Sequence, residues 1–150
     1  MAEQTEGTIE INATPEEVME VITDFDAYPT WAQGIKRAEV KKKDTQGRPK
    51  EVWMEASSMG IGAKYTLTYT YRAKNGGLSW KSKDAQGAVK SIDGEYTLEP
   101  AGDDTTKVRY RTSMELGIKV PGFMKKQGER MIIDTALKGL KKRVESSTSR

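Results

Sequence analysis

The stretch YTLTYTY, residues 65–71, decides the fold because its side chains alternate in character without a break. Successive side chains of a strand point to opposite faces of a sheet, so the three tyrosines and the leucine share one face and the threonines share the other. Buried tyrosines need partners for their hydroxyl groups. The row therefore either packs against protein that supplies such partners or lines a space that holds another molecule.

Turn-forming segments divide the middle of the chain into more strands of this kind. The segments DTQG, NGG, DAQG and PAGDD recur at the spacing of an antiparallel meander. Asn75-Gly76 predicts a type I′ hairpin turn, because both central positions of that turn need a positive φ. Together these signals predict strands near residues 8–11, 35–43, 49–58, 62–73, 78–84, 88–98 and 105–115.

Two short helices are predicted between the first strand and the meander. In ATPEEV, Thr14 can cap the helix, Pro15 suits its first position and Glu17 completes a capping box. The segment DAYPTW, residues 26–31, predicts a second short helical turn.

A long helix is predicted from Pro121 to about Glu145, a rod of roughly 38 Å. Its second half has one apolar stripe and packs as an ordinary amphipathic helix. Its first half has a separate row on nearly the opposite side. The stripe consists of Ile133, Leu137, Leu140 and Val144, and the row of Met124, Gly128, Met131 and Thr135.

Length and composition limit the classes of function. A chain of 150 residues predicts one domain, ordered over about 5–146, with a tail at 147–150. Cysteine and histidine are both absent, which excludes disulfides, Ser-His-Asp and Cys-His catalysis, and zinc sites of the usual ligands. We expect no cofactor and no metal.

Charge and hydropathy bear on partners and location. The net charge is +3, and the basic clusters at 41–43 and 138–143 fit a hairpin end and the polar side of a helix, so no nucleic-acid partner is expected. The acidic start MAEQTEGTIE does not resemble a signal peptide, and no run approaches about 20 apolar residues. We expect a cytoplasmic protein without an integral membrane segment. Transient membrane contact and the oligomeric state stay open.

The strand parity predicts an inward set that is aromatic and rich in methionine. On the strand EVWMEASS the parity leaves open whether Met54 or Glu55 faces inward. Such a set suits an apolar guest, but it equally suits a solid core packed on the C-terminal helix. The inward set comprises Tyr65, Leu67, Tyr69, Trp80, Tyr96, Tyr110 and Met114.

The order of elements, with IEINATPEEVMEVITDFDAYPTWAQGIKRAEV at the front, resembles the START-like (SRPBCC) superfamily, whose helix-grip fold includes the major birch pollen allergen. The segments YTLTYTY, LSWKS, VKSIDGEYTLEP, KVRYRTSMEL and VPGFMKKQGERMIIDTALKGLKKRVE are similar to those of its actinobacterial polyketide cyclase/dehydrase and coenzyme-Q-binding branch. The resemblance covers about residues 5–146. It implies an α+β fold in which a seven-stranded curved antiparallel sheet, two short helices and a long C-terminal helix enclose a cavity.

The resemblance implies that a lipid, isoprenoid, quinone or polyketide-like molecule binds between the sheet and the helix. The inward set would line this cavity, and Met124 and Met131 would border it, with Gly128 leaving room. We therefore predict a carrier of an apolar small molecule. One alternative is a cyclase or dehydratase with Tyr65, Tyr69 or Tyr110 as general acid and Glu55 as base. Another is a structural or partner-binding domain with a closed core.

Overall fold

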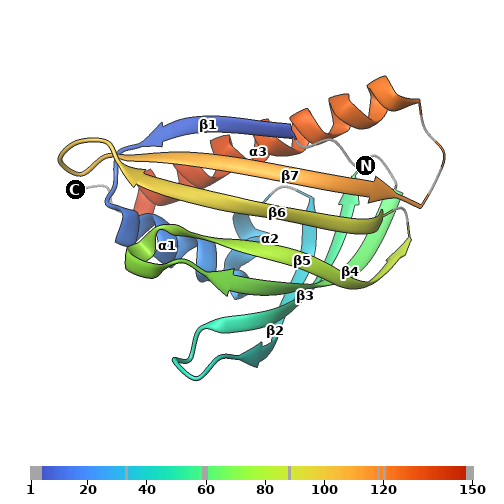
Figure 1. Ribbon diagram of the computed structural model, residues 1–150, viewed down its shortest axis with the longest axis horizontal. Helices are drawn as coiled ribbons and strands as arrows, with labels where there is room; N and C mark the ends of the chain where they lie inside the picture. The colour runs from blue at the N-terminus through green and yellow to red at the C-terminus, as the bar shows by residue number, and fades with distance from the viewer. Residues whose placement is uncertain are drawn as a thin grey trace.

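A computed structural model describes residues 5–32, 34–58, 61–87, 89–117, 119 and 121–147. Its strands form one antiparallel sheet in the order β1-β7-β6-β5-β4-β3-β2 (Figure 1). Every consecutive pair from β2 to β7 is a hairpin, and β1 closes the far edge beside β7, as the meander pattern predicts. The strands are β1 Thr5–Ile11, β2 Ile35–Lys43, β3 Pro49–Ser58, β4 Ile61–Tyr71, β5 Gly77–Gly87, β6 Val89–Pro100 and β7 Thr106–Leu116.

The short helical region begins where its capping signal predicts. Helix α1 spans Pro15–Thr23, followed by a 3-10 turn η1 at Phe25–Ala27 and a short helix α2 at Tyr28–Trp31. The Thr14 hydroxyl accepts a hydrogen bond from the Glu17 amide at 3.2 Å, and the Glu17 carboxylate accepts one from the Thr14 amide at 3.0 Å. Both halves of the predicted capping box are therefore present.

The turn between β4 and β5 differs from the prediction. It contains a 3-10 turn, η2, at Ala73–Asn75. The left-handed residues are Lys74 and Asn75, with φ of 58° and 56°, whereas Gly76 is right-handed at −78°. The predicted type I′ turn centred on Asn75-Gly76 is therefore wrong by one position. Gly77 takes the next positive φ, 123°, and its carbonyl accepts the Arg72 amide at 2.9 Å, which closes a longer loop.

Helix α3, Gly122–Ser147, is the long C-terminal helix and packs chiefly on β1 and β7 (Figure 1). A Cβ atom on Gly7 of β1 would lie 2.6 Å from Cγ2 of Ile133, so the glycine allows the helix to approach the strand closely. The predicted stripe of the second half is fully buried: Ile133, Leu137, Leu140 and Val144 are at most 4% exposed. Over the described ranges, no helix is long and apolar enough to cross a membrane.

The two faces of the sheet follow the predicted parity. The inner side chains of β3 to β7 join those of α1, η1 and α3 in one apolar core. The outer face carries ion pairs that cross the sheet: Glu95 pairs with Arg72 and Arg111, and Lys83 of β5 lies 2.9 Å from Glu51 of β3. The helix-grip architecture is confirmed: a curved antiparallel sheet holds the long helix, with the short helices alongside.

Candidate functional site

The inner row of β4 is buried as its alternation predicts. Tyr65, Leu67 and Tyr69 are 7%, 5% and 7% exposed. Tyr71 lies at the end of the strand and is half-buried. On neighbouring strands the remaining members of the inward set, Trp80, Tyr96, Tyr110 and Met114, are also buried.

Aromatic rings from four adjacent strands meet on this face and form what we call the aromatic cluster. The ring of Trp80 lies 6.0 Å from that of Tyr69, 5.5 Å from that of Tyr96 and 5.6 Å from that of Tyr110. Phe25 of η1 adds a ring 4.8 Å from Tyr69. These tilted and edge-on arrangements are the favourable ones for aromatic pairs. The cluster comprises Phe25, Tyr69, Trp80, Tyr96 and Tyr110.

Gly94 makes room for the centre of this cluster. It is the register partner of Trp80 on β6. A Cβ atom there would lie 2.6 Å from Cζ2 of Trp80 and 2.7 Å from the carbonyl oxygen of Arg111. The absence of a side chain lets the indole lie over the neighbouring strand, where it reaches the rings of Tyr96 and Tyr110.

Five of the six tyrosine hydroxyls divide into two groups, and that of Tyr110 interacts with the side chain of Thr112. Tyr71 donates to the Pro49 carbonyl at 2.5 Å, and Tyr28 donates to the Ile22 carbonyl. The hydroxyls of Tyr65, Tyr69 and Tyr96, which we call the free hydroxyls, make no hydrogen bond with any residue that the structure describes.

The free hydroxyls are not fully enclosed by protein. Within the described ranges, no side-chain nitrogen or oxygen atom that is shut off from solvent lacks a hydrogen-bond partner. Because the free hydroxyls have no partner among the described residues, their oxygen atoms touch space that a water molecule can reach, even though each residue is at most 8% exposed. Such space beside an unpaired donor is where water or a polar ligand atom is expected.

Burial keeps these phenols protonated. Loss of solvent raises the pKa of Tyr65 to about 12 and raises the pKa of Tyr69 and Tyr96 well above the ordinary value, with neighbouring tyrosines adding to the last two. Burial also raises the pKa of Tyr110. At neutral pH these groups are hydrogen-bond donors and acceptors rather than sources of negative charge.

Glu129 is a buried carboxyl group that the sequence pattern did not predict. It lies on α3 and is 1% exposed. One of its oxygens accepts the Thr5 hydroxyl at 3.0 Å and the other accepts the Met114 amide at 3.1 Å. Among the described residues, the register pair of β1 and β7 nearest to this amide is Thr5 with Thr112, and Met114 lies two residues further along β7. Glu129 therefore ties the first half of α3 to the sheet.

Three of the predicted site residues lie elsewhere. Met54 takes the inward position on β3, which leaves Glu55 on the outer face, 3.7 Å from Arg37. Met124 and Met131 are 50% and 56% exposed. They lie roughly 140–160° around the helix from Glu129, because successive residues rotate by about 100°. The face of α3 that meets the sheet is thus one continuous stripe through Glu129, and the two methionines are exposed, as are Phe123 and Ile132.

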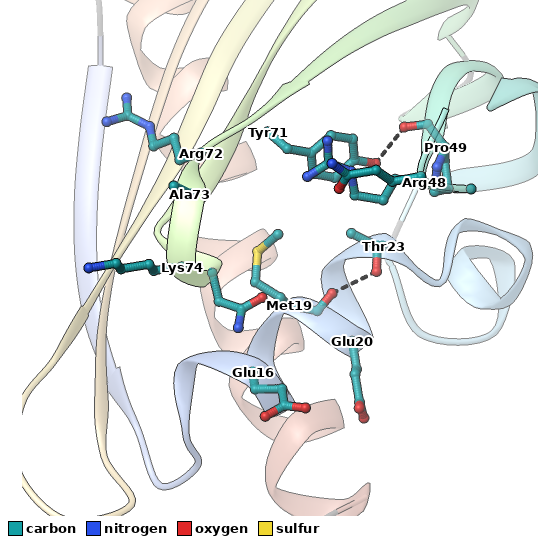
Figure 2. A pocket seen from close by; sticks show the side chains of 13 residues that line it. Glu16, Met19, Glu20, Thr23, Arg48, Pro49, Tyr71, Arg72, Ala73 and Lys74 are labelled. Carbon is teal, nitrogen blue, oxygen red and sulfur yellow. Dashed lines mark hydrogen bonds between the residues drawn. The ribbon is translucent and has the colours of Figure 1, made fainter. Parts of the chain in front are cut away.

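A polar crevice of about 770 Å³ opens at the end of the sheet near α1 (Figure 2). Met19 lies in its middle, with Tyr71 and Arg48 on one side and Glu16 and Glu20 on the other. The Arg48 guanidinium lies 4.6 Å from the centre of the Tyr71 ring. None of the free hydroxyls belongs to residues that line this crevice, so it is distinct from the aromatic cluster.

Comparison with solved structures identifies the fold. A START superfamily protein from Mycobacterium smegmatis is 24% identical, with a TM-score of 0.89 over 97% of this chain and 99% of that one. A conserved protein from Geobacillus kaustophilus is 19% identical, with a TM-score of 0.81 over 97% of each chain. The Zhui aromatase/cyclase from a Streptomyces species is 13% identical, with a TM-score of 0.73 over 97% of this chain and 94% of that one. At these identities the likeness shows a common fold.

Comparison at the sequence level identifies the family. No curated protein matches the chain. The model of the family described as polyketide cyclase / dehydrase and lipid transport matches residues 2–145. Because that match spans nearly the whole chain, the chain belongs to the polyketide cyclase/dehydrase and lipid transport family.

Proposed function

We propose that this protein binds an apolar small molecule between the sheet and α3, as a carrier or sequestering protein. Membership of the family supports a ligand-binding or cyclase-like role. The observation that carries the proposal is the set of free hydroxyls, which border accessible space within an otherwise apolar inner face. Burial of the ligand's apolar surface would supply the affinity, at about 25 cal/mol per Å².

A carrier role fits the chemistry of this face better than tyrosine acid catalysis. A general acid works best when its pKa lies near the operating pH. Burial instead raises the pKa of every candidate acid, which moves it further from neutral pH. The candidate acids are Tyr65, Tyr69 and Tyr110. The candidate base, Glu55, faces Arg37 on the outer side of the sheet.

Native mass spectrometry of freshly purified protein tests the proposal. We expect a co-purified apolar compound that leaves when the protein is denatured. We also expect members of a lipid and polyketide panel to raise the melting temperature, because ligand at 100 times its dissociation constant adds about 2.7 kcal/mol to the free energy of unfolding. A protein that carries nothing, and whose melting temperature no panel member changes, would instead have a closed core.

The Tyr69→Phe variant links the binding to the inner face. It should weaken binding of an oxygen-bearing ligand, because it removes one free hydroxyl while keeping the ring. The matched control is Thr68→Val, one residue earlier on the outer face of the same strand, which should bind as the unchanged protein does. Equal affinities of the two variants for every bound compound would show that the Tyr69 hydroxyl does not contact the ligand.

A further inference from the structure

The inner face offers a ligand hydrogen-bond donors that carry no charge. Tyr65, Tyr69 and Tyr96 come from two strands of the sheet, and their hydroxyls border accessible space without a hydrogen-bond partner among the described residues. A ligand oxygen that accepts from one of them would replace water at that position, as polar groups in ligand pockets commonly do.

The described residues of the same face include no buried lysine or arginine. Among the described residues, Glu129 is the one buried residue with an ionisable acidic or basic group other than tyrosine. The lysines and arginines of β4 to β7 are exposed, apart from half-buried Arg111, and on the outer face Arg111 and Arg72, which follows β4, pair with Glu95. A carboxylate that enters such a site loses its hydration and gains no counter-ion, which costs several kcal/mol.

We propose that the ligand is an uncharged molecule whose polar end is a hydrogen-bond-accepting oxygen, such as a ketone or ester carbonyl, and that a free carboxylate is rejected. This inference rests on the proposed function and specifies the ligand of that site. One cation could oppose it: half-buried Lys125 lies one helical turn before Glu129 on α3 and could hold a carboxylate at the edge of the site.

Four naphthalenes of nearly equal shape test the inference at pH 7.5. They are 2-ethylnaphthalene, 2-acetylnaphthalene, methyl 2-naphthoate and 2-naphthoate, with dissociation constants measured by calorimetry or tryptophan quenching. We expect the ketone and the ester to bind roughly 2- to 13-fold more tightly than the hydrocarbon, which is the contribution of one hydrogen bond. We expect 2-naphthoate to bind at least about 10-fold more weakly than its methyl ester.

Variants assign the preference to the free hydroxyls. In at least one of Tyr65→Phe, Tyr69→Phe and Tyr96→Phe, the advantage of the ketone over the hydrocarbon should fall to about twofold or less. Affinity for the hydrocarbon should change little, which also reports that the variant is folded. Tyr71→Phe is the matched control: its hydroxyl already donates to Pro49, so its removal should leave the advantage unchanged.

The outcomes separate the inference from the proposed function. If the hydrocarbon binds but the ketone has no advantage, or if 2-naphthoate binds as tightly as its ester, the inference is overturned and the carrier function stands. Binding of 2-naphthoate that disappears in Lys125→Gln would likewise overturn it, because a cation would then hold the polar end. If none of the four binds and the lipid panel is also without effect, both fail together.

Discussion

Gly94 shows how one residue shapes the inner face. The Gly94→Ala variant should lower the free energy of unfolding by about 1–3 kcal/mol, the usual cost of overpacking. The added methyl group would meet the Trp80 ring at 2.6 Å and the Arg111 carbonyl oxygen at 2.7 Å, and the backbone oxygen cannot move aside cheaply. Urea unfolding followed by circular dichroism measures the change.

The control for this substitution is the same change at Gly128. A Cβ atom there meets nothing within 4 Å, and the residue lies inside α3. Alanine is the better helix former, so Gly128→Ala should raise the free energy of unfolding by up to about 1 kcal/mol. If both substitutions change the free energy of unfolding by the same amount, the lack of space beside Trp80 does not govern the effect at Gly94. The preference of alanine for helix or strand would then govern both sites.

At the level of elements, Glu129 joins α3 to two strands. Glu129→Gln should lower the free energy of unfolding by about 1–3 kcal/mol. Both carboxyl oxygens accept hydrogen bonds, whereas an amide has only one oxygen, so either the Thr5 hydroxyl or the Met114 amide would face an NH₂ group. Urea unfolding measures the loss, and hydrogen exchange at the Met114 amide should be faster than in the unchanged protein.

Glu115→Gln is the control for this prediction. Glu115 follows Met114 on β7 but is exposed, so its change should stay within about 0.5 kcal/mol. If Glu129→Gln is as stable as the unchanged protein and the Met114 amide exchanges at the same rate, the carboxyl group does not hold the first half of the helix.

Helix α3 also shows where the sequence pattern stops being informative. The stripe of Ile133, Leu137 and Leu140 predicts the buried face of the second half, because apolar residues recur at helical spacing. Continued by one turn, the same stripe reaches Glu129, but a charged residue does not signal burial unless its partners are known. Those partners come from β1 and β7, more than 100 and about 15 residues away in the chain, and no local pattern reveals them.

For the whole molecule, the alternation of inward and outward side chains along the strands carries most of the information about the fold. The YTLTYTY row and its counterparts on later strands fix which side chains face inward, and the structure confirms that face for Tyr65, Tyr69, Trp80, Tyr96 and Tyr110. Alternation does not show which hydroxyls find partners. Tyr71 and Tyr69 lie on the same row, yet only Tyr71 reaches a carbonyl, because the chain at Pro49 passes the end of β4. The site thus depends on tertiary contacts that periodicity cannot supply.

The protein as a whole should lose stability steeply above pH 10. Its six tyrosines all have a pKa raised by burial, to about 12 for Tyr65 and Tyr71. In the unfolded chain tyrosines ionise near pH 10. A raised pKa in the folded state means that the unfolded state releases its protons first. The stabilisation is therefore complete below about pH 10 and is lost as the pH rises through the folded-state values.

Phenolate absorbance at 295 nm during a pH titration measures this directly. At pH 10.5 the folded protein should show little phenolate, whereas roughly three quarters of the tyrosines ionise in the same protein unfolded in urea. As the pH rises further, the absorbance should increase together with the loss of circular dichroism, because the buried hydroxyls ionise on unfolding. Gradual ionisation of several tyrosines near pH 10 with the fold intact would contradict the prediction. The inner face would then be open to bulk water, and its hydroxyls would be too well hydrated to discriminate between a neutral and a charged guest.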